Sequence, residues 1–108
     1  MIDETVIREA GQRLRYAAPR AQVILFGSHA RGDARRHSDL DFLVVEPEVG
    51  DEAEESVRLR RALTGLGIAA DVIVVSERYA EDWRDVRGSL VHRALQEGRA
   101  LTADGRSG

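Results

Sequence analysis

The sequence predicts one small domain of the α/β (α+β) class, in which helices cover a mixed sheet of three to four strands. Three short apolar runs, at residues 22–26, 39–46 and 70–75, are typical of buried strands. Amphipathic stretches lie before, between and after them, and strands that are apolar on both faces need helices on both sides of the sheet. The length of 108 residues fits a single domain. We expect this domain at 1–102 and a disordered tail at 103–108.

The helices are predicted from apolar side chains at helical spacing and from residues that can cap a first turn. Asp3, Asp51 and Ser76 are the candidate caps of the first three helices. The predicted helices are one at 3–18, one from Asp51 to the glycines at 65 and 67, a short one after Ser76 that carries Tyr79 and Trp83, and one at 86–97, with an edge strand at 99–102 after it.

Composition excludes several classes of function. The chain has no cysteine, so disulfides and thiolate metal sites are excluded. All 16 basic residues are arginine, so no lysine is present to bind a triphosphate. The net charge of −3 argues against a large nucleic-acid surface, and we expect no DNA partner. No apolar run approaches the roughly 20 residues of a membrane span, and no signal peptide is recognisable. We therefore expect no membrane association and a cytoplasmic location.

A glycine-serine pair follows the first predicted strand directly. Gly27 permits a sharp backbone turn and the close approach of a ligand. Ser28 can cap the short polar segment after it, and exposed amides at a helix start suit a phosphate. Arg31 can add a charge-assisted hydrogen bond to the same anion. This signal is weak when taken alone, because many strand-to-helix turns contain Gly-Ser.

Two aspartates begin the second predicted strand. Asp39 and Asp41 are two residues apart, so their side chains share one face of that strand. Two neighbouring carboxylates repel each other, and a hard divalent cation such as magnesium removes that cost. Taken alone, the pair is more often two exposed carboxylates at a strand end.

A third aspartate, Asp71, precedes the apolar run Val-Ile-Val-Val. Acidic residues are depleted in strands, although an aspartate at a strand edge can simply face water. If the third strand lies beside the second, Asp71 joins Asp39 and Asp41. Three carboxylates can hold two metal ions, one that activates the attacking oxygen and one that stabilises the leaving pyrophosphate.

Together, Gly27-Ser28-His29-Ala30-Arg31-Gly32, Ser38-Asp39-Leu40-Asp41 and Asp71 resemble the nucleotidyltransferase superfamily, which includes DNA polymerase beta and the kanamycin nucleotidyltransferases. The short chain resembles the minimal nucleotidyltransferases (MNT proteins), which are often encoded beside HEPN proteins as antitoxin and toxin. The resemblance implies the nucleotidyltransferase fold. It also implies that Gly27 and Ser28 hold a triphosphate, that Arg31 is the motif arginine, that Asp39 and Asp41 bind magnesium, and that Asp71 completes the metal site and can deprotonate the acceptor.

This resemblance implies a magnesium-dependent enzyme, with manganese as a possible substitute and two ions in the site. The expected reaction moves AMP from ATP, or from another nucleoside triphosphate, onto a hydroxyl of a partner protein. The resemblance implies that the partner is a HEPN toxin, and the 108 residues leave little room for an acceptor domain. Two alternatives stay open: a non-catalytic antitoxin that acts by occlusion, and an aminoglycoside-type transferase that modifies a small molecule.

Overall fold

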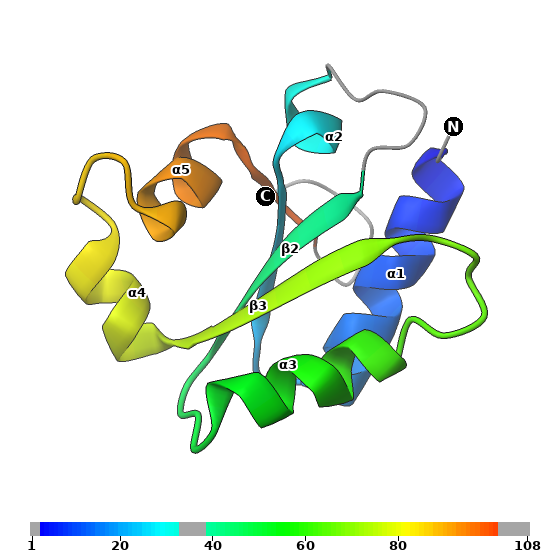
Figure 1. Cartoon of the computed structure of the whole chain (residues 1–108), viewed down its shortest axis with the longest axis horizontal. Coiled ribbons are helices and arrows are strands. Elements are labelled where there is room, and N and C mark those ends of the chain that lie inside the picture. Colours follow the sequence, from blue (N-terminus) through cyan, green and yellow to red (C-terminus); the bar gives the residue numbers. More distant parts are fainter. Residues whose placement is uncertain (1–2, 33–38, 102–108) are drawn as a thin grey trace.

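The computed structural model describes residues 3–32 and 39–101, which form a four-stranded mixed sheet between helices (Figure 1). The strand order is β3-β2-β1-β4. The elements are α1 (Glu4–Ala17), β1 (Gln22–Phe26), α2 (Ser28–Arg31), β2 (Leu40–Glu46), α3 (Glu52–Arg61), β3 (Ala70–Ser76), α4 (Glu77–Trp83), α5 (Leu90–Glu97) and β4 (Arg99–Ala100). The α/β class and the four-stranded mixed sheet predicted from the sequence are therefore confirmed.

The register of the central strands brings distant residues of the chain together. β2 pairs with β1 in the antiparallel direction, with Phe26 opposite Asp41. β2 pairs with β3 in the parallel direction, with Asp41 opposite Asp71. The third strand thus lies beside the second, which was the condition for Asp71 to join the other two aspartates.

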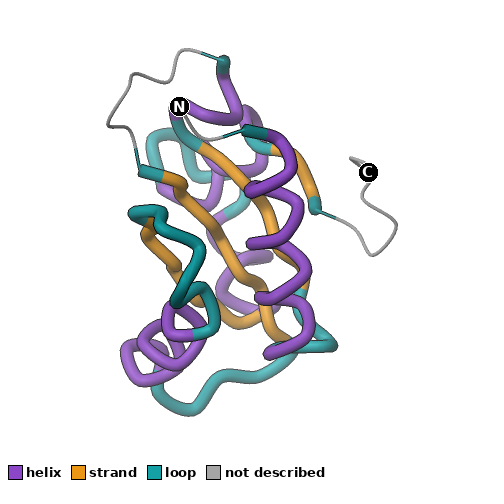
Figure 2. Tube along the Cα trace, turned by 90° about the vertical axis from the view of Figure 1, so that its right-hand side faces the viewer, coloured by secondary structure: helices purple, strands orange, loops and turns teal. Residues whose placement is uncertain are grey.

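The two faces of the sheet bury different side chains. On one face, Phe42 and Val44 pack in a core with residues of α1 and α3, such as Leu14 and Leu59. On the other face, strand residues pack with residues of α4 and α5; this second-face core contains Ile24, Phe26, Leu43, Val45, Ile73, Val75, Ala80, Leu90 and Ala94. Figure 1 shows α4 and α5 apart from α1 and α3, and in Figure 2 α1 lies in front of the strands. Because side chains alternate along a strand, Asp41 and Asp71 lie on the same face as Leu43 and Ile73.

The caps of α1, α3 and α4 follow the sequence prediction, whereas the predicted Ser28 cap was wrong, because Gly27 is the N-cap of α2 and no side chain caps that helix. Asp3 accepts from the Val6 N–H at 3.0 Å, and Asp51 accepts from the Glu54 N–H at 3.0 Å. Ser76 Oγ accepts from the Tyr79 N–H at 3.1 Å. Each side chain satisfies an amide that has no partner within its own helix.

The predicted start of the last helix was wrong. Residue 86 lies in a turn, and α5 begins only at Leu90, where Ser89 Oγ accepts from the His92 N–H at 3.1 Å. The apolar Val86 suggested a helical face, but its side chain is exposed. Gly88 follows it with a φ of 83°, which breaks the helical path. The predicted edge strand is present at Arg99–Ala100, whereas the expected tail at 103–108 lies outside the described residues.

Within the described residues, no helix is both long enough and apolar enough to span a membrane.

A pair of glutamates links the end of β2 to α3. Burial, followed by the hydrogen bond and the negative charge of Glu55, raises the pKa of Glu46 to about 7. The guanidinium of Arg58, which donates two hydrogen bonds of 2.7 Å to Glu55, lowers the pKa of Glu55 to about 2, and the hydrogen bond with Glu46 lowers it further. Glu46 therefore gains and loses its proton near neutral pH, whereas Glu55 is ionised there.

Replacing Glu46 with Gln is expected to stabilise the protein at pH 8.5 but not at pH 5. The pKa of Glu46 in the fold, about 7, lies above the reference value of 4.5. Its contribution to stability is thus fully present below the reference value and is lost as the pH rises through about 7. Allowing for partial exposure, we expect a gain on the order of 1 kcal/mol, or roughly 4–8 °C in the melting temperature.

Thermal unfolding followed by circular dichroism at both pH values measures this difference. Glu48→Gln, at an exposed glutamate two residues later, is the matched control. Equal shifts of the melting temperature at both pH values for Glu46→Gln would contradict the raised pKa of Glu46.

Candidate functional site

The glycine-serine motif forms the turn from β1 into α2. Gly27 caps α2 with a φ of 80°, in the region that favours glycine. The Ala30 and Arg31 amides donate to the Gly27 carbonyl at 3.1 and 3.0 Å, which closes the turn of Ser28–Arg31. The sequence motif thus forms the strand-to-helix turn that was predicted.

Gly27 lies directly against Asp41. A Cβ built on Gly27 would meet the Asp41 carboxylate, whose Cγ is 3.2 Å away. The register explains this contact, because Asp41 faces Phe26, the residue before Gly27. From the sequence, Gly27 was expected to leave space for a ligand. In the structure the space that its missing side chain leaves is taken by Asp41, so the turn and the acidic strand are in contact.

The structure brings the three predicted aspartates to one end of the β2–β3 pair. Asp41 is partly buried, whereas Asp39, just before β2, and Asp71, near the start of β3, are exposed. Burial raises the pKa of Asp41, and the negative charges of Asp71 and then Asp39 raise it further. Arg93 and His29 lower the same pKa. Asp39 and Asp71 are therefore both close enough to Asp41 for their charges to act on it.

These carboxylates suit a hard divalent cation. All three offer oxygen donors, and the repulsion that raises the pKa of Asp41 is what a bound cation would relieve. As the side chains stand, no three histidine or acidic side chains in the described part of the chain meet at metal-binding distance. The fit of the site to magnesium therefore depends on donor chemistry and strand register, and the carboxylates must turn towards an ion.

The sequence analysis missed Glu97, which contacts the motif turn from the last residue of α5. Glu97 Oε1 accepts from the Gly27 N–H at 3.3 Å and from Arg31 Nη1 at 3.0 Å. Glu97 is 70 residues away from Gly27 in the chain, so local spacing gives no signal for this contact. The contact ties α5 to the turn and places a carboxylate beside Arg31.

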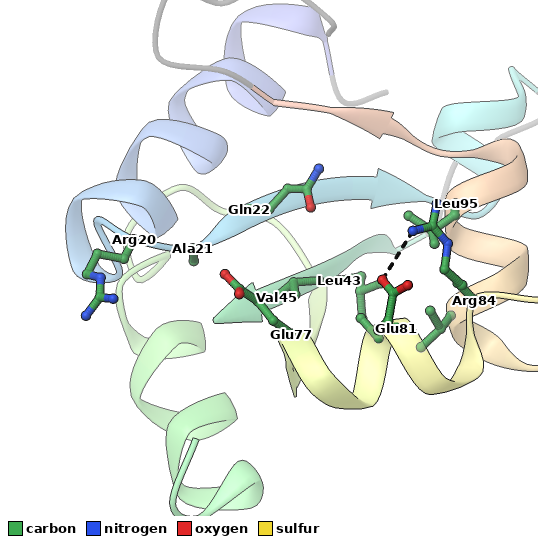
Figure 3. Close-up of a pocket in the computed structure, with 11 residues that line it drawn as sticks. Arg20, Ala21, Gln22, Leu43, Val45, Glu77, Glu81, Arg84 and Leu95 are labelled. Carbon is green, nitrogen blue, oxygen red and sulfur yellow. Dashed lines mark hydrogen bonds and ion pairs between the residues drawn. The ribbon is translucent and has the colours of Figure 1, made fainter. Parts of the chain in front are cut away.

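A separate hollow lies along the second face of the sheet (Figure 3). Leu43 and Val45 of β2 line it together with α4, where Arg84 and Glu81 form an ion pair of 3.3 Å. None of the predicted site residues lines this hollow. The hollow lies along the part of β2 that is away from the three aspartates.

The Tyr79–Trp83 pair also lies away from the aspartates. α4 follows Ser76 at the far end of β3 from Asp71, roughly 17 Å along the strand. The two rings stack on each other, with centroids 5.7 Å apart, and both stay partly exposed. The two rings therefore form a self-stacked pair at a distance from the candidate site.

Comparisons with known proteins agree with this geometry. The chain is 33% identical over 105 residues to a Methanocaldococcus jannaschii protein named "Putative protein adenylyltransferase", an alignment that covers 94% of this chain and 99% of that one. The solved "putative minimal nucleotidyltransferase" is 36% identical with a TM-score of 0.60 and covers 90% of this chain and 94% of its own. A toxin–antitoxin structure with AMP-PNP is 26% identical with a TM-score of 0.53 and covers 94% and 73%.

The family model of the nucleotidyltransferase domain matches residues 5–97, which include all of the predicted site residues. This match spans most of the chain, and the solved minimal nucleotidyltransferase shares its fold. The chain therefore belongs to the nucleotidyltransferase domain family and has a transferase role.

Proposed function

We propose that this protein is a magnesium-dependent nucleotidyltransferase that moves AMP from ATP onto a hydroxyl of a partner protein. One observation carries the proposal: Asp41 is at once the register partner of Asp71 and the direct neighbour of the Gly27 turn. A site for a triphosphate and a site for its metal ions must adjoin in such a reaction. The contact between the turn and the acidic strand supports this arrangement.

Each residue has a role in the proposed reaction. Asp39 and Asp41 hold magnesium together with Asp71, and manganese is a chemically similar substitute. Bound ions would neutralise the charge that develops on the phosphates. Ser28 and the turn hold the triphosphate, with Arg31 beside them.

The transfer exchanges one bond for another at the α-phosphorus. The acceptor hydroxyl loses its proton to Asp71, which is exposed and therefore accessible to a second substrate. The oxygen–phosphorus bond to the acceptor forms while the bond between the α-phosphorus and the bridging oxygen breaks. Pyrophosphate leaves from the side of the phosphorus opposite the attacking oxygen.

The proposed acceptor is a helical protein of the HEPN class. Two likenesses support a protein acceptor: the relative from Methanocaldococcus jannaschii has a name that describes a protein adenylyltransferase, and a similar solved structure is a toxin–antitoxin complex with AMP-PNP. The resemblance to MNT proteins favours a HEPN toxin encoded nearby. In this view the protein is an antitoxin that acts by chemical modification.

Labelled ATP, magnesium and the helical protein encoded beside this chain test the proposal together. We expect label on the partner, and we expect a chelator to abolish the labelling. Asp71→Asn should reduce labelling by at least about a hundredfold, because it removes the proposed base, yet leave the complex intact on size-exclusion chromatography. Asp82→Asn, at an exposed aspartate of α4, is the matched control.

Three outcomes separate the candidate functions. Label on the partner supports protein modification. A stable complex without label, with toxin still neutralised by Asp71→Asn, would favour the non-catalytic antitoxin. A labelled small molecule in the presence of aminoglycosides would favour the third candidate.

A further inference from the structure

Helix α5 covers the sheet face on which Asp41 and Asp71 lie. Leu90 and Ala94 of α5 pack in the second-face core with Leu43 and Val45. Asp41 continues the same row of β2 side chains beyond Leu43. The axis of α5 thus runs along the face that contains the acidic residues, towards the motif turn that Glu97 contacts.

Arg93 is one helical turn before Glu97 on α5. Residues four apart lie on the same side of a helix, so Arg93 lies next to Glu97. The Glu97 carboxylate accepts hydrogen bonds from Gly27 and Arg31. The Arg93 side chain is exposed, and within residues 3–32 and 39–101 it makes no hydrogen bond or ion pair. It is nevertheless close enough to Asp41 to lower the pKa of that carboxyl.

Arg31 already has an acidic partner within the site. Glu97 forms an ion pair of 3.0 Å with Arg31 and so offsets part of its charge. A triphosphate brings about four negative charges to a region that already contains three aspartates. The chain has no lysine, so any further cation of its own must be an arginine. Arg93 is an arginine whose position on α5 puts it one turn from Glu97 and the motif turn, and its guanidinium has no hydrogen-bond or ion-pair partner among residues 3–32 and 39–101.

We propose that Arg93 of α5 is a further binding residue of this site and contacts the polyphosphate of the donor nucleotide and of the leaving pyrophosphate. An exposed guanidinium on the face above Asp41 can reach a phosphate held between the Gly27 turn and the acidic residues. Its planar donors match phosphate oxygens in a bidentate manner. This inference rests on the proposed function, because it names a second contact to the same donor.

Calorimetric titration of the full chain with AMP-PNP and magnesium tests this contact. Arg93→Gln should weaken binding roughly tenfold or more, as expected for loss of a charge-assisted hydrogen bond. Arg93→Lys keeps the charge but loses the planar pair of donors, so its affinity should lie between those of the parent and Arg93→Gln. Inorganic tripolyphosphate should displace the nucleotide from the parent at a lower concentration than from Arg93→Gln. A purely structural role would change the melting temperature, which we expect to stay the same.

Arg78→Gln is the matched control, since Arg78 is an exposed helical arginine on α4, which follows the far end of β3. It makes the same change in net charge and should bind AMP-PNP as the parent does. Equal affinity of the parent and Arg93→Gln would overturn the role of Arg93 and leave the proposed function standing. A parent protein that binds neither AMP-PNP nor tripolyphosphate would overturn both. Equal losses in Arg78→Gln and Arg93→Gln would reduce the effect to net charge and also overturn the contact.

Discussion

Replacing Asp41 with Asn is expected to reduce nucleotide transfer by at least about a hundredfold while the fold stays intact. Asp41 is central to the site, because on β2 it is the register partner of Asp71 on β3, and it also touches the Gly27 turn. Loss of its charge weakens the hold on a divalent cation, and metal-based stabilisation of a transition state amounts to several kcal/mol. Transfer of label from ATP to the partner, at saturating magnesium, measures this loss.

The same substitution is expected to raise the melting temperature in metal-free buffer. Burial and the charges of Asp71 and Asp39 raise the pKa of Asp41, so the ionised carboxylate is unfavourable in the fold. An amide of the same shape removes this cost. A loss of transfer together with a gain in stability would distinguish loss of a functional group from damage to the fold.

Asp82→Asn is the control for both measurements, because Asp82 lies on α4, which follows the far end of β3. It should change neither transfer nor stability by much. Transfer at the parental rate in Asp41→Asn would remove Asp41 from the proposed metal site, whatever its effect on the melting temperature.

The elements that could be predicted from the sequence are those that depend on local patterns. The apolar runs around Ile24, Leu43 and Val74 predicted the strands, and side-chain caps such as Asp51 marked helix starts. The position of Asp71 beside Asp41 followed once the third strand was placed next to the second. These features depend on the spacing of apolar residues along the chain and on which strands are neighbours in the sheet, and both can be inferred from a single sequence.

Contacts between distant segments could not be predicted in this way. Glu97 looks like an ordinary acidic residue at a helix end, and only the packing of α5 brings it to Gly27. Arg93 likewise acquires a possible role only because α5 covers the face that contains Asp41. The register of β1 on β2, which makes Asp41 the neighbour of Gly27, depends on the whole sheet and not on the motif itself.

Replacing Gly27 with Ala is expected to abolish nucleotide binding and transfer together. A side chain there has two costs. The φ of 80° with a ψ of −158° lies in a region that is essentially restricted to glycine, at a cost of roughly 1–3 kcal/mol for other residues, and the new Cβ collides with the Asp41 carboxylate. Asp41 must then leave its place between the Gly27 turn and Asp71, which disturbs the proposed metal ligands, and the turn must shift at its contact with Glu97.

Gly88→Ala separates these two costs. Gly88 has a φ of 83°, close to that of Gly27, but a Cβ built on it meets nothing within 4 Å. Both variants should lose stability because a side chain is strained at positive φ, and a lower melting temperature measures this loss. Only Gly27→Ala should also lose AMP-PNP binding and transfer.

If both variants bind AMP-PNP as the parent does, the contact between Gly27 and Asp41 is a packing feature of the sheet, and the turn does not hold the triphosphate. If both lose binding equally, the loss reflects general instability, because Gly88 touches neither Asp41 nor the turn.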